Sequence, residues 1–89
     1  MKVMVKGHEL KLGRYALLRN GEILRYGVHR AMKGYRCEYC EKDIKPGEAY
    51  FRVSLWLPNF GWDSGEVMCS QCIGEEELQK IVQLQGKEG

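Results

Sequence analysis

The chain has 89 residues, of which 44% are hydrophobic and 29% are charged, and its net charge is +2. A chain of this length forms one small domain that buries a modest share of its surface and often needs a metal, disulfides or a partner for stability. No segment approaches the roughly 20 apolar residues of a membrane helix, and the N-terminus lacks the apolar run of a secretory signal. We therefore expect an intracellular protein, cytoplasmic or nuclear, with no membrane association.

Positive charge is concentrated in the N-terminal third of the chain. Residues 1–36 contain nine lysines and arginines against two glutamates, a net charge of +7, whereas residues 37–72 and 73–89 have net charges of −3 and −2. Contact with nucleic-acid phosphates requires such a basic surface. We accordingly divide the chain into a basic N-terminal region, residues 1–36, and a cysteine-containing region, residues 37–89.

The basic region reads as β-structure. Lys2–Val5 is a short β-branched strand, and Arg14–Tyr26 contains two apolar runs on either side of Asn20 and Gly21. Asn-Gly is the strongest two-residue hairpin signal because both central residues of a type I′ turn have positive φ. Residues 27–36 predict a loop with one helical turn. The turn fixes the hairpin register as Arg19 opposite Glu22, Leu18 opposite Ile23, Leu17 opposite Leu24, and Tyr15 opposite Tyr26.

Four cysteines form two Cys-x2-Cys pairs, Cys37 with Cys40 and Cys69 with Cys72, separated by 28 residues. Four thiolates are the donor set of a closed, tetrahedral, structural zinc site, and the two-residue spacing lets a tight turn direct both sulfurs of a pair at one ion. Redox dithiols and structural disulfides are the alternatives. We expect one structural Zn²⁺, with no open coordination position for a catalytic water, and we expect chelation to unfold the C-terminal two-thirds of the chain.

The remaining elements of the cysteine-containing region predict an α+β fold. Alternation predicts a strand over Ala49–Leu57 and a return strand near Glu66–Met68, and a helix follows with Ser70 as N-cap and Gly86 at its end. With Cys69 just before this helix and Cys72 inside its first turn, the arrangement is a small treble-clef-like zinc domain: a knuckle, a β-hairpin and a C-terminal helix, with the N-terminal hairpin packed on it. The alternative is an all-β zinc ribbon with both pairs on knuckles.

The segment "CEYCEKDIKPGEAYFRVSLWLPNFGWDSGEVMCSQC" resembles the zinc fingers of poly(ADP-ribose) polymerases and of some eukaryotic DNA ligases. The likeness lies in the first pair of cysteines, Ile44 and Gly47 in the turn, Arg52 on the strand and Cys72 as last ligand, while Cys69 stands where that family has histidine. The resemblance implies a finger that grips the DNA backbone and stacks a hydrophobic loop on exposed base pairs. It assigns Arg52 to a phosphate, and Phe60 or Trp62 to stacking.

These patterns favour a nucleic-acid-binding module, acting directly or within a nucleic-acid complex. The alternative is a protein-interaction adaptor that uses the aromatic loop Leu55–Gly65, because aromatic side chains dominate interface hot spots. A third interpretation folds this loop back as a lid on a core too small to close without it. The candidate contact residues are Arg14, Arg19, Arg25, Arg30, Arg52, Trp56, Phe60 and Trp62.

Nothing in the sequence predicts an enzyme or a small-molecule substrate. Treble-clef nucleases of the HNH type need a histidine on the hairpin, and none lies between Cys40 and Cys69. His8 and His29 lie outside the cysteine motif and are interpreted as ordinary surface or core residues. Asp63 and Glu66 fall in a loop with no identifiable base or metal partner, so paired-carboxylate hydrolysis is not expected.

Overall fold

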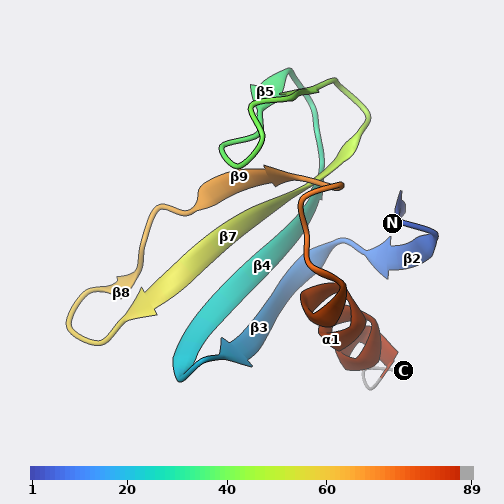
Figure 1. Ribbon diagram of the computed structural model, residues 1–89. Helices are drawn as coiled ribbons and strands as arrows, with labels where there is room; N and C mark the ends of the chain where they lie inside the picture. Colours follow the sequence, from blue (N-terminus) through green and yellow to red (C-terminus); the bar gives the residue numbers. More distant parts are fainter. Residues whose placement is uncertain (87–89) are drawn as a thin grey trace.

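The computed structural model describes residues 1–86; residues 87–89, the end of the predicted second region, lie outside the described part. Antiparallel strands form one main sheet in the order β3-β4-β7-β8, with β9 also paired to β7 (Figure 1). Two small sheets, β1-β2 and β5-β6, flank it. The elements are β1 (Lys2–Val5), β2 (His8–Lys11), β3 (Gly13–Arg19), β4 (Glu22–Arg30), β5 (Tyr35–Arg36), β6 (Asp43–Ile44), β7 (Ala49–Leu57), β8 (Gly61–Trp62), β9 (Glu66–Cys69) and α1 (Glu75–Gly86).

The predicted hairpin is confirmed with its register, from Arg19 opposite Glu22 to Tyr15 opposite Tyr26. Asn20 and Gly21 have φ of 50° and 80°, as a type I′ turn requires. The prediction of a loop with a helical turn directly after Tyr26 was wrong. The second strand continues to Arg30, because its backbone pairs with β7 along that whole length.

The basic region and the cysteine-containing region share the main sheet. Pairing of β4 with β7 runs from Leu24 opposite Leu55 to Arg30 opposite Ala49. The predicted strand over Ala49–Leu57 is confirmed as β7, and the return strand as β9. The N-terminal hairpin is therefore joined to the cysteine-containing region by backbone hydrogen bonds as well as by side-chain packing.

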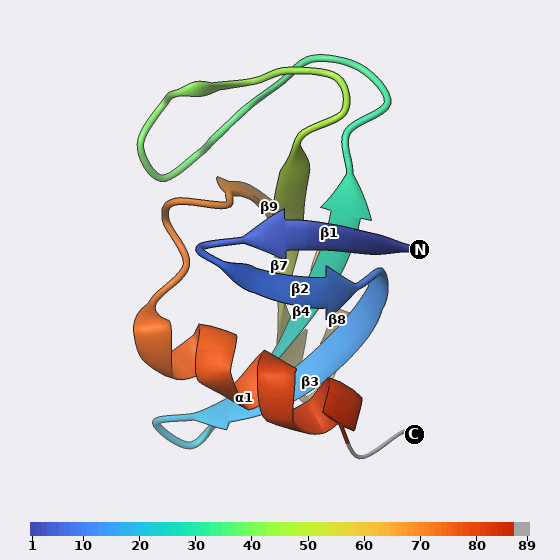
Figure 2. The ribbon, with the colours of Figure 1, turned by 90° about the vertical axis from the view of Figure 1, so that its right-hand side faces the viewer.

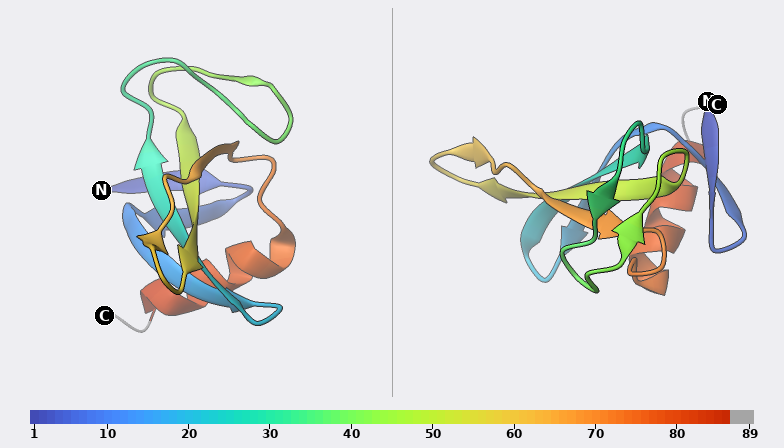
Figure 3. Two further views of the ribbon diagram at one scale, coloured as in Figure 1. Left: turned by 90° about the vertical axis from the view of Figure 1, so that its left-hand side faces the viewer. Right: turned by 90° about the horizontal axis from the view of Figure 1, so that it is seen from above.

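The inner face of the sheet carries the main core. The β1-β2 hairpin and α1 lie in front of the sheet in Figure 2 and behind it in the opposite view of Figure 3, left. Alternate residues of each strand point to this side, since successive side chains of a strand face opposite ways. The buried members of this cluster are Val3, Val5, Leu10, Tyr15, Leu17, Tyr26, Val28, Phe51, Val53, Met68, Ile73, Leu78 and Ile81.

The outer face, defined by the alternate residues of β3, β4, β7 and β8 that point away from this core, is covered only at one end. There a second cluster forms beside the cysteines, from Ala31, Cys37, Ile44, Tyr50, Val67 and Cys69. The β7-β8 hairpin projects away from both clusters (Figure 3, right). Most of the outer face, including the arginines described below, therefore lies outside both cores.

The structure has the expected α+β composition and a C-terminal helix that ends at Gly86, but the helix starts later than predicted. It begins at Glu75, and Cys72 precedes it on a turn in which the Cys72 amide donates to the Cys69 carbonyl at 3.1 Å. The predictions of Ser70 as N-cap and of Cys72 inside the helix were wrong. The Cys-x2-Cys turn occupies these residues, and Gly74 supplies the first carbonyl of the helix, to Leu78.

Gln85 is a polar residue on α1 whose side chain has two hydrogen-bond partners on β2, whereas Leu78 and Ile81 of the same helix are buried. Its Oε1 accepts from the Lys11 amide at 2.9 Å and its Nε2 donates to the Glu9 carbonyl at 2.7 Å. The side chain thus satisfies backbone groups of β2, whose only strand partner among the described residues is β1. Both bonds are solvent-exposed, which limits what each contributes.

We expect Gln85→Leu to lower the free energy of unfolding by about 1 kcal/mol, because two exposed hydrogen bonds are lost while apolar contact is retained. Urea denaturation followed by circular dichroism measures this. Gln83→Leu is the matched control, since Gln83 is exposed on the same helix and its side chain forms no hydrogen bond within residues 1–86. Equal stability of the two variants would show that the Gln85 bonds contribute nothing.

Candidate metal centre and outer sheet face

The four cysteines converge on one point, as the sequence predicted. All four Sγ atoms lie within 4.8 Å of one another. The Cys37–Cys72, Cys40–Cys69 and Cys69–Cys72 sulfur pairs are 3.7, 3.6 and 3.5 Å apart. Sulfurs at tetrahedral vertices around Zn²⁺, each about 2.3 Å from the ion, would be about 3.8 Å apart. Disulfide sulfurs are about 2.05 Å apart, so these cysteines are free thiols spaced for a metal.

Backbone amides prepare one of the sulfurs to act as a thiolate. The Cys69 and Tyr39 amides donate to Cys37 Sγ at 3.2 and 3.4 Å. Burial alone would raise the pKa of Cys37, but these amides and that of Cys40 outweigh it and lower the pKa to about 6. Burial and the neighbouring thiols raise the pKa values of Cys69 and Cys72 instead. Four sulfurs crowded together without a cation oppose each other's ionisation, and a divalent ion removes that opposition.

The donor set fits Zn²⁺ in a closed structural site. Cys37 and Cys69 are buried, Cys72 is half-buried and Cys40 is exposed. The first pair lies on the turn between β5 and β6, and the second lies on the turn that ends β9. All four ligands therefore come from turns at one end of the main sheet. An ion here would tie residues 37–40 to the end of β9.

An aromatic stack continues from this metal-binding end along the outer face. Tyr35 packs on Tyr50 with ring centroids 4.8 Å apart, and Tyr50 stacks on His29 at 5.3 Å. Tyr50 lies opposite Cys69 in the register of β7 with β9. β7 therefore pairs on one edge with β9, which carries Cys69, and on its other edge with β4, which carries His29.

Strand alternation sorts the five candidate arginines into two groups. Arg14, Arg25 and Arg52 lie on the outer face, because their neighbours Tyr15, Tyr26 and Phe51 are buried in the inner core. The other two are engaged elsewhere. Arg19 forms an ion pair of 3.8 Å with Glu77, and Arg30 donates to the Lys2 carbonyl at 2.7 Å.

The three outer arginines surround a surface hollow of about 270 Å³. Arg14 and Arg52 flank Gly27 in the strand register, one on each neighbouring strand. Gly27 is buried, and the His29 imidazole lies against it where a Cβ atom would be. None of the three arginines forms an ion pair with a carboxylate within residues 1–86. The hollow is lined by Arg14, Arg25, Gly27, His29, Tyr50, Arg52 and Ser54.

Burial and two of the outer arginines determine the protonation state of His29 in this hollow. Its pKa is lowered by burial first and then by the charges of Arg52 and Arg14. The imidazole is therefore neutral at pH 7, and one of its ring nitrogens carries a hydrogen that can be donated. The hollow thus combines three guanidinium groups with a neutral donor.

The aromatic residues of the Leu55–Gly65 segment adjoin the hollow and stay outside the core. Trp56 and Trp62 pair across β7 and β8 with their rings edge to face at 5.2 Å, and Arg25 lies 4.6 Å above the Trp62 ring. Trp56 is 40% exposed, and Phe60, in the turn between the two strands, is 86% exposed. Neither core cluster contains these side chains, so the lid interpretation does not describe this structure.

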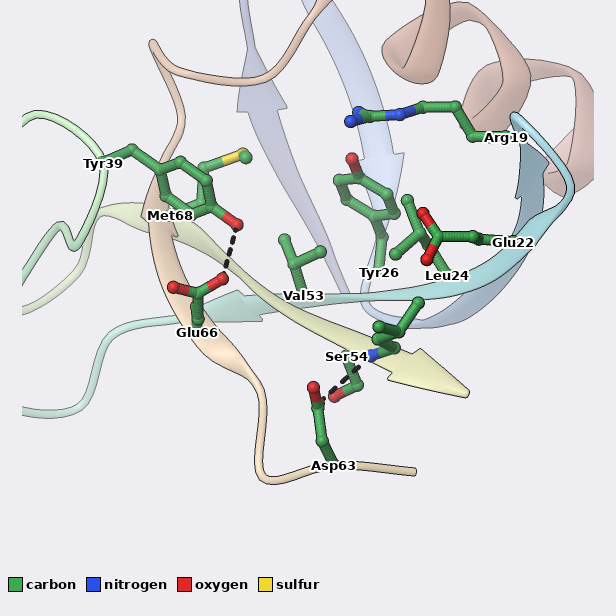
Figure 4. A pocket seen from close by; sticks show the side chains of 11 residues that line it. Arg19, Glu22, Leu24, Tyr26, Tyr39, Val53, Ser54, Asp63, Glu66 and Met68 are labelled. Atoms are coloured by element: carbon green, nitrogen blue, oxygen red, sulfur yellow. Dashed lines mark hydrogen bonds between the residues drawn. The ribbon is translucent and has the colours of Figure 1, made fainter. Parts of the chain in front are cut away.

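The opposite side of the main sheet carries a cavity of different character (Figure 4). It has a volume of about 230 Å³, and its lining includes Glu22, Asp63 and Glu66 together with Arg19. Asp63 accepts from the Leu55 and Gly65 amides at 3.1 and 3.0 Å, and Glu66 accepts from the Tyr39 hydroxyl at 3.2 Å. This cavity is thus lined by three acidic side chains, whereas the hollow, with which it shares Ser54, is lined by none.

Two of these carboxylates, which the sequence suggested were isolated, share this cavity. Burial and the nearby Glu66 raise the pKa of Tyr39 to about 12, so its hydroxyl stays protonated and donates to that carboxylate. Asp63 holds the backbone turn that leads into β9. The contacts of both carboxylates are therefore explained by the local fold.

Sequence reasoning missed Gly27, His29, Tyr50 and Ser54 as lining residues of the hollow. The prediction ended the second hairpin strand at Tyr26, so the continuation through Gly27 was not assigned a face. Extending the alternation by four residues would have placed Arg25, Gly27 and His29 on one side. The alternation of the strand thus continues past Tyr26, but Gly27 has no side chain and made the pattern hard to recognise.

No helix within residues 1–86 is long and apolar enough to cross a membrane. The search of family models, of curated proteins and of solved structures found no match to this chain, so its likeness to the poly(ADP-ribose) polymerase and DNA ligase fingers rests on the quoted residues alone.

Proposed function

We propose that this protein is a non-enzymatic, zinc-stabilised module that binds nucleic acid directly through its outer sheet face. The zinc has a structural role, and the contacts come from Arg14, Arg25 and Arg52 with the aromatic side chains beside them. The observation that carries the proposal is the group of three arginines around Gly27, none of which has a carboxylate partner in the described chain.

Electrostatics and stacking act together on this face. Guanidinium groups bind phosphate oxygens through paired hydrogen bonds. No carboxylate within residues 1–86 holds any of the three, although Arg52 donates to the Ser64 carbonyl at 3.5 Å. Stacking of a base on an exposed aromatic ring contributes roughly 1–3 kcal/mol, and the exposed Trp56 contacts Trp62, over which Arg25 lies. Three acidic residues, Glu22, Asp63 and Glu66, line the cavity on the other side of the sheet.

The dependence of affinity on salt tests this proposal. Fluorescence anisotropy of a labelled oligothymidylate should show binding at low salt, with a slope of log K against log salt of about −0.7 for each phosphate of the single strand that is neutralised. Absence of binding to single-stranded and duplex DNA and RNA at low salt would overturn the proposal.

The second candidate function is protein binding, and exposed apolar side chains favour it. Phe60 at the β7-β8 turn is 86% exposed, and Leu18 and Ile23 on the β3-β4 hairpin are 66% and 42% exposed. Such side chains are typical anchors of protein interfaces. A protein adaptor would retain partner binding when Arg14, Arg25 and Arg52 are neutralised, whereas a nucleic-acid-binding module would not.

A further inference from the structure

We propose that the hollow above Gly27 is a binding site for one backbone phosphate of a single-stranded nucleic acid, whose neighbouring base stacks on the Trp56–Trp62 pair. This inference rests on the function proposed above. It specifies where on the protein the nucleic acid binds and that the nucleic acid is single-stranded.

The register of the sheet places three arginines around one glycine. Arg14 and Arg52 lie in one register row on either side of Gly27, so their Cα atoms are about 10 Å apart across two strand spacings. Arg25 is on the same face, two residues before Gly27. All three arginines line the hollow beside the glycine, and the His29 imidazole lies where a Cβ atom of residue 27 would be.

The chemistry of the lining selects an anion with several oxygens. The lining contains three arginines, a histidine, a tyrosine and a serine, and it contains no aspartate or glutamate. Guanidinium groups match the planar pairs of oxygens in phosphate, and three of them offer more donors than a carboxylate can accept. The hollow, at about 270 Å³, is also smaller than the pockets that hold drug-sized ligands, which start at roughly 300 Å³.

Arg25 connects the hollow to the aromatic pair, and this connection indicates a single strand. It lines the hollow, and its guanidinium lies 4.6 Å above the Trp62 ring, which in turn contacts Trp56. A base next to a phosphate in the hollow therefore meets an aromatic surface. Bases in a duplex are covered by their neighbours, whereas an unpaired base can leave the stack and pack on such a ring.

Gly27→Ala tests the phosphate site with a small change. The added Cβ would lie 2.7 Å from His29 Nε2 and 3.6 Å from the Arg52 carbonyl, so it fills the floor and displaces a flexible side chain while the backbone stays in place. We expect affinity for oligothymidylate to fall about 10-fold, the loss of roughly one charge-assisted contact. Gly34→Ala is the matched control, because its Cβ would meet nothing closer than 4.0 Å.

Three oligonucleotides of equal length separate the parts of the inference: oligothymidylate, an abasic strand with the same phosphates, and a duplex. We expect wild-type protein to prefer oligothymidylate, Gly27→Ala to weaken both single strands, and Trp56→Ala to weaken only the strand with bases. Zinc content and near-ultraviolet circular dichroism confirm that each variant is folded. Equal affinity for duplex and oligothymidylate, or unchanged binding by folded Gly27→Ala, would overturn this inference while leaving nucleic-acid binding intact. Failure of wild-type protein to bind any of the three would overturn both.

Discussion

Replacing Cys37 and Cys40 with serine is expected to unfold the whole protein. A structural zinc site of this type contributes about 10–16 kcal/mol at pH 7, and the total stability of a small domain is about 5–15 kcal/mol. The two clusters cannot separate easily, because β7 supplies Phe51 to one and Tyr50 to the other, and β9 supplies Met68 to one and Val67 to the other. Loss of the metal-binding end therefore removes support from both faces of the sheet.

Near-ultraviolet circular dichroism and zinc analysis measure this effect. Chelation of zinc from the wild-type protein should abolish the aromatic signal together with the metal, and readdition of Zn²⁺ should restore both, whereas Mg²⁺ should not, since it prefers oxygen ligands. A zinc-free protein that keeps its aromatic spectrum and its denaturation midpoint would refute a structural role for the metal.

Neutralising Arg25 and Arg52 together is expected to lower affinity for oligothymidylate by about 100-fold at low salt. Each hydrogen-bonded contact between charged groups contributes about 1.5–3 kcal/mol, and 1.4 kcal/mol corresponds to a tenfold change. The double substitution to glutamine should leave zinc content unchanged, because neither arginine contacts a cysteine ligand in the described hydrogen bonds. It should also reduce the salt slope by about 0.7, the share of one phosphate of a single strand.

The chain supplies its own control for this experiment. Arg19→Gln with Arg30→Gln removes the same total charge, from the two ends of the β3-β4 hairpin, but these arginines contact Glu77 and the Lys2 carbonyl. We expect this variant to lose less than threefold in affinity, through the long-range field only. Equal losses in the two double variants would show that net charge, and not the outer face, determines binding.

Local signals predicted the parts of the fold that depend on few residues. Asn20-Gly21 alone set the register of β3 with β4, since a two-residue turn admits one pairing. The cysteine spacing predicted the cluster of four sulfurs because two tight turns and one ion impose it. The apolar alternation of β7 likewise indicated its strand.

Features set by distant contacts could not be predicted in this way. The continuation of β4 through Gly27 depends on β7, and glycine weakens the local strand signal. β2 is a strand because Gln85, 76 residues from Glu9, and α1 cover its edge. The start of α1 depends on the turn that places Cys72 beside Cys37, with sulfurs 3.7 Å apart. In each case a tertiary partner overrides the local preference.

The separation of the arginines is the part of the candidate site that needed the structure most. In the sequence, Arg14, Arg19, Arg25 and Arg30 are a single basic series on one hairpin. The pleat divides them, and β7 then adds Arg52 from the acidic middle of the chain to the outer group. The net charge of each segment therefore underestimated what the region after Cys37 contributes to the basic outer face. The electrostatic potential depends on which face of the sheet a charge lies on, and not on its position along the chain.

Nuclear magnetic resonance titration of the zinc-loaded protein with oligothymidylate identifies the binding face residue by residue. We expect the largest shifts on the amides of Arg25, Gly27 and Arg52 and on the indole groups of Trp56 and Trp62, and we expect α1 and the β1-β2 hairpin to stay unperturbed. Shifts confined to α1 and that hairpin, or no shifts at low salt, would contradict this expectation.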